Sequence, residues 1–254
     1  MIAIRTPREL DKLRRAGEMV GRVLDRMEAL VVPGVSTSEL DLEARQLIER
    51  EGGRPAFLGY RGYPATLCVS IDHEVVHGIP GKRRLEDGMI VSIDVGTVVD
   101  GYYGDGARTF PVGSISSEAQ RLLDATREAL AAGIDAARPG NRVGAIGAAV
   151  SKVARREKLG VVRALTGHGI GVEMHEPPQI PNFGSPEEGE PIESGMVLAI
   201  EPMLNLGGHE VEFLSDGWTV RTKDGSLSAH FEHTVAVTPS GPEILTRSVA
   251  LSHG

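Results

Sequence analysis

GMIVSID (Gly88–Asp94) and GMVLAIE (Gly195–Glu201) share one pattern: a Gly-Met pair, an apolar run and a closing acid. In each copy the glycine ends an acidic turn sequence, LEDG in the first and IESG in the second. A short apolar run bounded by turn residues is typical of a buried strand. A carboxylate at the end of such a strand is costly unless a cation or a hydrogen-bond donor pairs with it. The sequence therefore predicts two related strands that deliver one acid each to a shared site.

The repeat extends beyond these two strands. Pro33-Gly34 corresponds to Pro139-Gly140 at an offset of 106 residues, and Asp94 corresponds to Glu201 at an offset of 107. A period this long is typical of a duplicated half-domain rather than a solenoid. We therefore predict a single domain over residues 1–254, with halves of about 1–112 and 113–254. The halves would pack around a pseudo-twofold axis, with Asp94 and Glu201 facing each other across it.

Composition narrows the class of protein. The 254 residues carry a net charge of -8 and contain no basic run, so direct nucleic-acid binding is not expected. The apolar stretches are too short for a membrane span, and the N-terminus lacks a secretory apolar core. Cys68 is the single cysteine, which excludes an intrachain disulfide and fits a reducing compartment.

Capping signals and apolar periodicity predict four helices separated by strands. Thr6-Pro7-Arg8-Glu9 is a helix start with a capping box, and Val32-Pro33-Gly34 ends that helix. Ser36 with Glu39 repeats the capping signal for a second helix. Further helices are expected over 117–137 and 142–157, and strands over 67–71, 89–95, 102–112, 161–165, 196–200, 217–221 and 230–238.

A hairpin is predicted to bring a second acid beside Asp94. Asp100-Gly101 is a two-residue turn signal, which would pair Val99 with Tyr102. Counting back along both strands, Gly96 faces Asp105 and Asp94 faces Ala107. Asp94 and Asp105 then become diagonal neighbours on one face, with the glycine leaving room between them. Two carboxylates in one gap repel unless a cation or a proton lies between them. Asp100 itself is expected to be a solvated turn acid.

Other polar residues lie in glycine- and proline-rich loops or at strand ends. His168 lies within TGHGIG, His175 within MHEPP and His77 within HGIP. A single histidine is more often structural than catalytic, but three beside strand-end acids form a stronger set. Glu201 closes its strand before Pro202. Alternation along 230–238 places Glu232 with His230 and Thr234 on one face and His233 on the other, so His233 is interpreted as structural.

Four carboxylates and one imidazole form an oxygen-rich ligand set. Such ligands suit manganese, iron(II) or cobalt, and zinc is also compatible. Four negative charges balance two dications, so two divalent metal ions per chain are predicted. Dinuclear centres support hydrolysis because bound water becomes a nucleophile near neutral pH. The predicted ligands are Asp94, Asp105, His168, Glu201 and Glu232.

Taken together, these motifs resemble those of type I methionine aminopeptidase. HGIP, SIDVG, GDGART, TGHGIG, HEPP, AIEPM and DGWTVRTKDGSLSAHFEHT occur in the order of that family from about Ile4 to Thr246. The resemblance implies a catalytic domain with the α+β pita-bread fold, in which two pseudo-symmetric halves surround a curved antiparallel sheet with helices outside. It also implies a dinuclear metal site made of the same five residues.

The resemblance assigns the metal ligands to two positions. Asp94 would bind one metal, and His168 with Glu201 would bind the other. Asp105 and Glu232 would bridge both. A bridging water or hydroxide would attack the first peptide carbonyl, and Glu201 would accept the proton.

Two further histidines would assist the reaction. His175 would hydrogen-bond the carbonyl oxygen, and His77 would contact the scissile amide. The reaction implied is removal of the N-terminal methionine from nascent proteins and peptides with a small second residue. The methionine pocket implied by the family positions consists of Phe57, Tyr60, Tyr63, Cys68, Met174 and Trp218, together with His77 and His175.

Three positions depart from well-studied bacterial members of the family. Phe57 replaces a common cysteine, Met174 a common phenylalanine, and His230 a frequent glutamine beside Glu232. These changes concern pocket shape and metal preference. The resemblance to the compact bacterial form further implies a cytoplasmic monomer that acts on deformylated nascent chains near the ribosome.

Two alternatives remain open at this point. Proline dipeptidase, aminopeptidase P and creatinase share the implied fold but usually carry an additional N-terminal domain. A binding protein could also keep the fold and lose catalysis, although such relatives typically lose metal ligands. All five predicted ligands and both auxiliary histidines are present in this chain.

Overall fold

The computed structural model describes residues 2–247, and its helices follow the predicted bounds closely. Thr6 and Ser36 form complete capping boxes with Glu9 and Glu39, so the predicted helix starts are confirmed. None of the described helices is long and apolar enough to cross a membrane. The helices are α1 (Pro7–Leu30), α2 (Thr37–Arg50), α3 (Ser117–Ala136) and α4 (Val143–Glu157), with one 3-10 turn, η1 (Tyr60–Gly62).

The strands are shorter and more numerous than the sequence indicates. The segment predicted as one strand over 230–238 is interrupted at Phe231, because the chain passes there from one sheet into another. The strands are β1 (Arg54–Pro55), β2 (Leu67–Ile71), β3 (Glu74–Val76), β4 (Ile90–Val99), β5 (Tyr102–Pro111), β6 (Gly160–Val161), β7 (Gly167–Gly169), β8 (Glu176–Ile180), β9 (Val197–Ile200), β10 (Met203–Asn205), β11 (Val211–Phe213), β12 (Val220–Thr222), β13 (Ser228–His230), β14 (Glu232–Thr238) and β15 (Gly241–Ile244).

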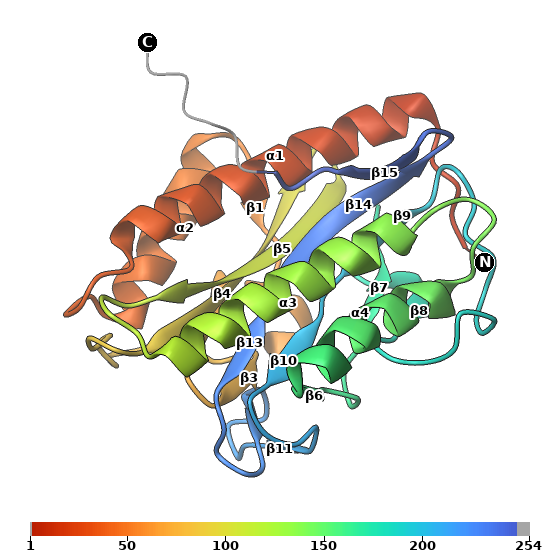
Figure 1. Ribbon diagram of the computed structural model, residues 1–254. Coiled ribbons are helices and arrows are strands. Elements are labelled where there is room, and N and C mark those ends of the chain that lie inside the picture. The colour runs from red at the N-terminus through yellow and green to blue at the C-terminus, as the bar shows by residue number, and fades with distance from the viewer. Residues whose placement is uncertain (1, 248–254) are drawn as a thin grey trace.

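A nine-stranded antiparallel sheet forms the centre of the molecule. Its order is β1-β4-β5-β14-β9-β7-β8, with β2 also pairing with β4 and β15 with β14. The two halves of the chain meet where β5 pairs with β14, through Glu232 opposite Ala107 and His233 opposite Gly106. Two three-stranded sheets, β13-β10-β6 and β11-β12-β3, lie beside it. The paired helices α1–α2 and α3–α4 cover the sheet from outside (Figure 1).

The β4–β5 hairpin has the register predicted from its Asp-Gly turn. Val99 pairs with Tyr102, Gly96 with Asp105, and Asp94 with Ala107. The turn residues Asp100 and Gly101 both have positive φ, as a turn of this kind requires. Asp94 and Asp105 therefore share one face of the hairpin.

The two copies of the opening motif repeat in backbone geometry as well as in sequence. Gly88 has a φ of 94° and Gly195 a φ of 96°, both in the left-handed region. The Gly88 N–H donates to the Val112 carbonyl at 2.9 Å, and the Gly195 N–H donates to the Val237 carbonyl at 2.8 Å. Each glycine thus begins a strand whose first hydrogen bond reaches the end of a neighbouring strand of its own half.

Apolar packing is divided between the halves. In the first half, Val20, Leu24 and Met27 of α1 and residues of α2 pack against β2 and β4. In the second half, α3 and α4 pack against β9 and β14, with Leu122 and Ile146 fully buried. A third cluster, around Tyr63 and Met174, lies beside the predicted site residues. Each half therefore has its own core, and the sheet joins them.

A buried threonine joins the two halves at the position of Asp105. The Thr234 hydroxyl accepts a hydrogen bond from the Asp105 N–H at 3.0 Å and donates to its carbonyl at 2.8 Å. In Thr234→Val both backbone groups lose this partner while buried. We expect the free energy of unfolding to fall by about 1–3 kcal/mol in urea denaturation.

Thr66→Val is the matched control for Thr234→Val. Thr66 is equally buried, but its hydroxyl has no hydrogen-bond partner in the described structure. Its replacement should leave the unfolding free energy unchanged or raise it. Equal losses in the two variants would show that the Thr234 contacts contribute nothing specific.

Candidate metal centre

One cavity of about 160 Å³ brings together all thirteen residues predicted for the site. It also contains Arg61, which the sequence analysis did not identify. The lining residues are Phe57, Tyr60, Arg61, Tyr63, Cys68, His77, Asp94, Asp105, His168, Met174, His175, Glu201, Trp218 and Glu232.

The five predicted ligands come from five consecutive strands of the central sheet. In sheet order they are Asp94 on β4, Asp105 on β5, Glu232 at the start of β14, Glu201 directly after β9 and His168 on β7. Antiparallel pairing fixes where each strand places its side chain. Residues separated by up to 138 positions in the chain therefore meet at one place because their strands are neighbours.

The tightest part of the site is formed by Asp105, His168 and Glu232. One ligand atom from each lies within 4.8 Å of the others, and all three side chains are buried. The His168 Nδ1–H donates to the Gly169 carbonyl at 2.9 Å, so the lone pair is on Nε2. That nitrogen lies 3.8 Å from Asp105 Oδ2 and 3.7 Å from Glu201 Oε1. Spacings of this kind suit ligands arranged around a shared cation.

Burial shifts the protonation of every predicted ligand toward its neutral form. It raises the pKa of Asp94 to about 7. Burial, followed by repulsion from neighbouring carboxylates, also raises the pKa of Asp105, Glu201 and Glu232 well above the usual range. Burial lowers the pKa of His168 to about 3, which keeps its imidazole neutral. The protein alone therefore supplies no positive charge to balance these acids.

Several carboxylate oxygens in the cavity have no hydrogen-bond partner. Asp94 Oδ1, Asp105 Oδ1 and Glu232 Oε1 are buried and unpaired within the described structure. Leaving such atoms unpaired is costly, whereas a divalent cation would satisfy them. Carboxylate oxygens with one neutral imidazole are a suitable donor set for a first-row divalent metal. The residues present thus fit a metal centre.

His77 and His175 lie beside the five ligands in the same cavity. Burial lowers the pKa of His77 to about 4. Burial, and then the nearby Arg61 guanidinium, lower the pKa of His175. The His175 ring is tilted against His168 with ring centroids 4.3 Å apart. Both auxiliary histidines are therefore neutral imidazoles that can donate or accept one proton.

The remaining wall of the cavity is aromatic and sulfur-rich. The Tyr63 hydroxyl lies 2.9 Å from both the Leu67 and Gly78 carbonyls, and its ring packs edge-on against Trp218 at 5.0 Å. Gly96 makes this wall possible, because a Cβ at that position would lie 2.7 Å from the Phe57 ring and 3.1 Å from Met174 Cε. We predicted that Gly96 leaves room between Asp94 and Asp105, and the structure shows that it also makes room for Phe57 and Met174.

Three residues near the ligands have roles that motif reasoning did not predict. Asn182 is fully buried and donates through Nδ2 to the Glu201 carbonyl at 3.0 Å. His230 is also buried, with Nε2 3.8 Å from Glu201 Oε2 and 4.0 Å from Glu232 Oε2. Arg61 has a φ of 50° between Gly59 and Gly62, and this glycine spacing was the signal that could have identified it.

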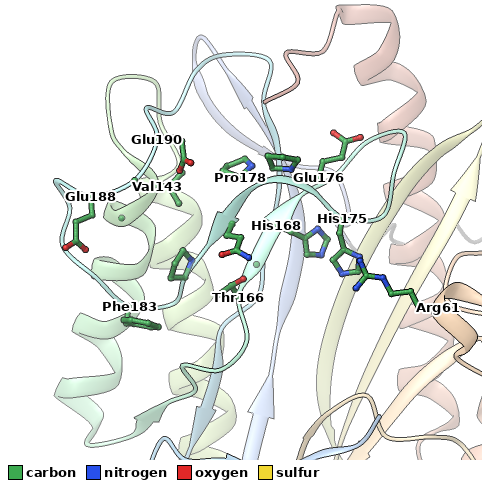
Figure 2. A pocket seen from close by; sticks show the side chains of 16 residues that line it. Arg61, Val143, Thr166, His168, His175, Glu176, Pro178, Phe183, Glu188 and Glu190 are labelled. Atoms are coloured by element: carbon green, nitrogen blue, oxygen red, sulfur yellow. The ribbon is translucent and has the colours of Figure 1, made fainter. Parts of the chain in front are cut away.

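A larger groove of about 780 Å³ adjoins the cavity. It shares Arg61, His168 and His175 with the cavity and extends toward the start of α4. Figure 2 shows these three side chains at one end of the groove, and Glu188 and Glu190 at the other. The metal ligands lie in the smaller cavity, so the groove serves as an approach to the chemistry rather than its centre.

Comparisons with known proteins agree with this arrangement. A model of metallopeptidase family M24 matches residues 11–239. Methionine aminopeptidase 1 of Bacillus subtilis (strain 168) is 48% identical over 247 residues, covering 97% of this chain and 100% of that protein. A crystal structure of methionine aminopeptidase from Rickettsia prowazekii has a TM-score of 0.96 at 42% identity, covering 97% of this chain and 100% of that one.

A more distant neighbour bears on the first alternative. Prolidase from Pyrococcus furiosus has a TM-score of 0.77 at 23% identity, and the match covers 97% of this chain but only 66% of that chain. This likeness extends to the fold alone. The curved antiparallel sheet with outer helices is thus the pita-bread fold common to these proteins, as predicted. With full-length matches at 42–48% identity, the chain belongs to metallopeptidase family M24 and, within it, to the methionine aminopeptidases.

Proposed function

We propose that this chain removes the N-terminal methionine from peptides and nascent proteins whose second residue is small. One observation carries the proposal: four carboxylates and a neutral imidazole from five adjacent strands share a cavity with an aromatic, sulfur-containing wall. The first group suits a hydrolytic metal centre, and the second suits a thioether side chain. Membership of the methionine aminopeptidases supports the same reading.

The proposed centre holds two divalent ions, through Asp94, Asp105, His168, Glu201 and Glu232. Four carboxylates balance two dications, which supports this number, and the oxygen-rich set suits manganese, iron(II) or cobalt as well as zinc. When bound, such ions lower the pKa of a coordinated water and polarise the substrate carbonyl.

The surrounding residues would orient the substrate and move protons. Glu201 lies among the ligands with a raised pKa, so it can accept a proton during attack. His175, kept neutral, would donate an N–H to the carbonyl oxygen as charge develops there. His77 would contact the scissile amide. The methionine side chain would lie against Phe57, Tyr60, Tyr63, Cys68, Met174 and Trp218.

The rest of the peptide would leave through the adjoining groove. An extended chain passing His175 and Arg61 enters this groove directly, which supports a peptide rather than a small-molecule substrate (Figure 2). The resemblance to bacterial relatives supports a cytoplasmic monomer acting on nascent chains near the ribosome. These last assignments are part of the proposal.

The decisive test compares two peptides before and after metal removal. We expect the chelator-treated protein to be inactive and anaerobic addition of Mn²⁺ or Co²⁺ to restore cleavage of Met-Ala-Ser. His175→Ala should lower kcat about 10²-fold or more, because a donor to the developing oxyanion is lost. Preference for an Ala-Pro peptide would assign a proline-specific activity instead. Activity that survives complete metal removal would reject the mechanism.

Replacing Asp94 should change how the stability of the metal-free protein depends on pH. The folded-state pKa of about 7 lies above the ordinary value of 3.8. The carboxyl therefore contributes its full stability below about pH 4, and that contribution is lost as the pH rises through about 7. Asp94→Asn should gain unfolding free energy relative to wild type over this interval, as measured by urea denaturation in chelator.

Two comparisons check the Asp94 result. Asp100→Asn is the control, because that turn acid is exposed and paired with Arg15. It should show no such pH-dependent gain. Adding Mn²⁺ should reverse the order of Asp94→Asn and wild type, because only wild type keeps the complete ligand set. An Asp94→Asn curve parallel to wild type in chelator would contradict the assignment.

His230 should support the metal centre without belonging to it. Both of its ring nitrogens are unpaired, and Nε2 is too far from Glu201 and Glu232 for a direct hydrogen bond. Donation through one water would satisfy both sides. His230→Leu should weaken Mn²⁺ binding by calorimetry about 10- to 100-fold, whereas His230→Gln, which keeps an N–H donor, should bind nearly as wild type.

The neighbouring histidine provides a matched control for His230. His233 lies two residues farther along the strand, where its Nδ1 contacts the Thr246 hydroxyl at 2.8 Å. His233→Gln should leave Mn²⁺ affinity unchanged. Equal weakening in His230→Leu and His233→Gln would mean that general loss of packing, rather than a donor to the carboxylates, explains the effect.

A further inference from the structure

The loop that carries Tyr60 has an unusual backbone. Gly59, Arg61 and Gly62 have φ values of 82°, 50° and 88°, so Tyr60 is surrounded by residues in the left-handed region. Glycine adopts this region freely, but an arginine does so only where its surroundings hold it there. The loop is closed by a hydrogen bond from the Gly59 N–H to the Tyr63 carbonyl at 2.8 Å. Such a backbone indicates a side chain held in a required position.

The side chain held in this way is placed on His175. The Tyr60 hydroxyl oxygen lies 2.8 Å from His175 Nδ1, and the two rings are stacked at 25° with centroids 5.4 Å apart. The opposite side of the imidazole faces the metal ligands, because His175 is also packed against His168. Tyr60 thus contacts the one ring nitrogen that does not face the site of chemistry.

We propose that Tyr60 is a positioning residue for His175: its hydroxyl donates to Nδ1 and so keeps the proton of the neutral ring on Nε2. The two tautomers differ in what they can do. With the proton on Nε2, His175 presents a donor to a developing oxyanion; with the proton on Nδ1, it presents a lone pair that repels one. Stacking also limits rotation of the ring. This inference rests on the proposed function only for its effect on turnover.

The methionine-pocket assignment gives Tyr60 a different role. A residue that only forms the pocket wall would change KM for the methionine side chain and leave the imidazole tautomer as it is. A positioning residue would change the tautomer and kcat. Tyr60→Phe separates these roles, because it keeps the ring and its stacking and removes only the hydroxyl.

The test measures the tautomer and the kinetics separately. In metal-free, ¹⁵N-histidine-labelled protein at pH 8, ¹⁵N shifts distinguish protonated from unprotonated ring nitrogens, with His175 assigned by comparison with His175→Gln. We expect Nε2–H in wild type and a measurable Nδ1–H population in Tyr60→Phe. With Mn²⁺ and Met-Ala-Ser, kcat should fall about 3- to 10-fold, as for loss of one neutral hydrogen bond, with KM little changed.

Tyr103→Phe is the matched control, since Tyr103 packs against the same apolar cluster as Tyr60 without contacting His175 in the described structure. It should leave the His175 tautomer and kcat as in wild type. A wild-type His175 protonated on Nδ1, or a tautomer unchanged in Tyr60→Phe, would overturn the proposal. If the tautomer shifts as expected but wild type does not cleave Met-Ala-Ser, the proposed function fails and the positioning role stands.

Discussion

Mutual repulsion among Asp94, Asp105, Glu201 and Glu232 is the constraint on which the rest of the site depends. Each acid is buried, and each has a pKa raised by that burial. A core cannot hold four such groups ionised without compensating positive charge. No lysine or arginine of the described structure lines this cavity apart from Arg61, beside His175. The fold is therefore organised to hold a cation, and it supplies the ligands from strands whose own hydrogen bonds keep them in place.

Local sequence signals predicted the parts of this arrangement that depend on short-range geometry. The Asp100-Gly101 turn determined the hairpin register, and alternation then placed Asp94 and Asp105 on one face. Capping boxes at Thr6 and Ser36 determined where two helices begin. In each case the deciding contacts lie within a few residues of one another.

Features that depend on distant partners were less accessible. Two- and three-residue strands such as β1, β6 and β10 carry too few residues for an alternation pattern, and they exist because a neighbouring strand pairs with them. The contact between Tyr60 and His175 joins residues 115 positions apart. That all predicted ligands share a cavity required the family resemblance, because no local pattern specifies that β14 lies between β5 and β9.

The repeated Gly-Met strands show how one scaffold can hold an asymmetric site. The two halves keep the same turn geometry at Gly88 and Gly195 and separate apolar cores. Only four residues, 113–116, connect β5 to α3 between them. A chain opened in this connection would leave Asp94 and Asp105 on one fragment and His168, Glu201 and Glu232 on the other. The molecule is in this sense a tethered heterodimer, and an intact metal centre would report that its two fragments had reassembled.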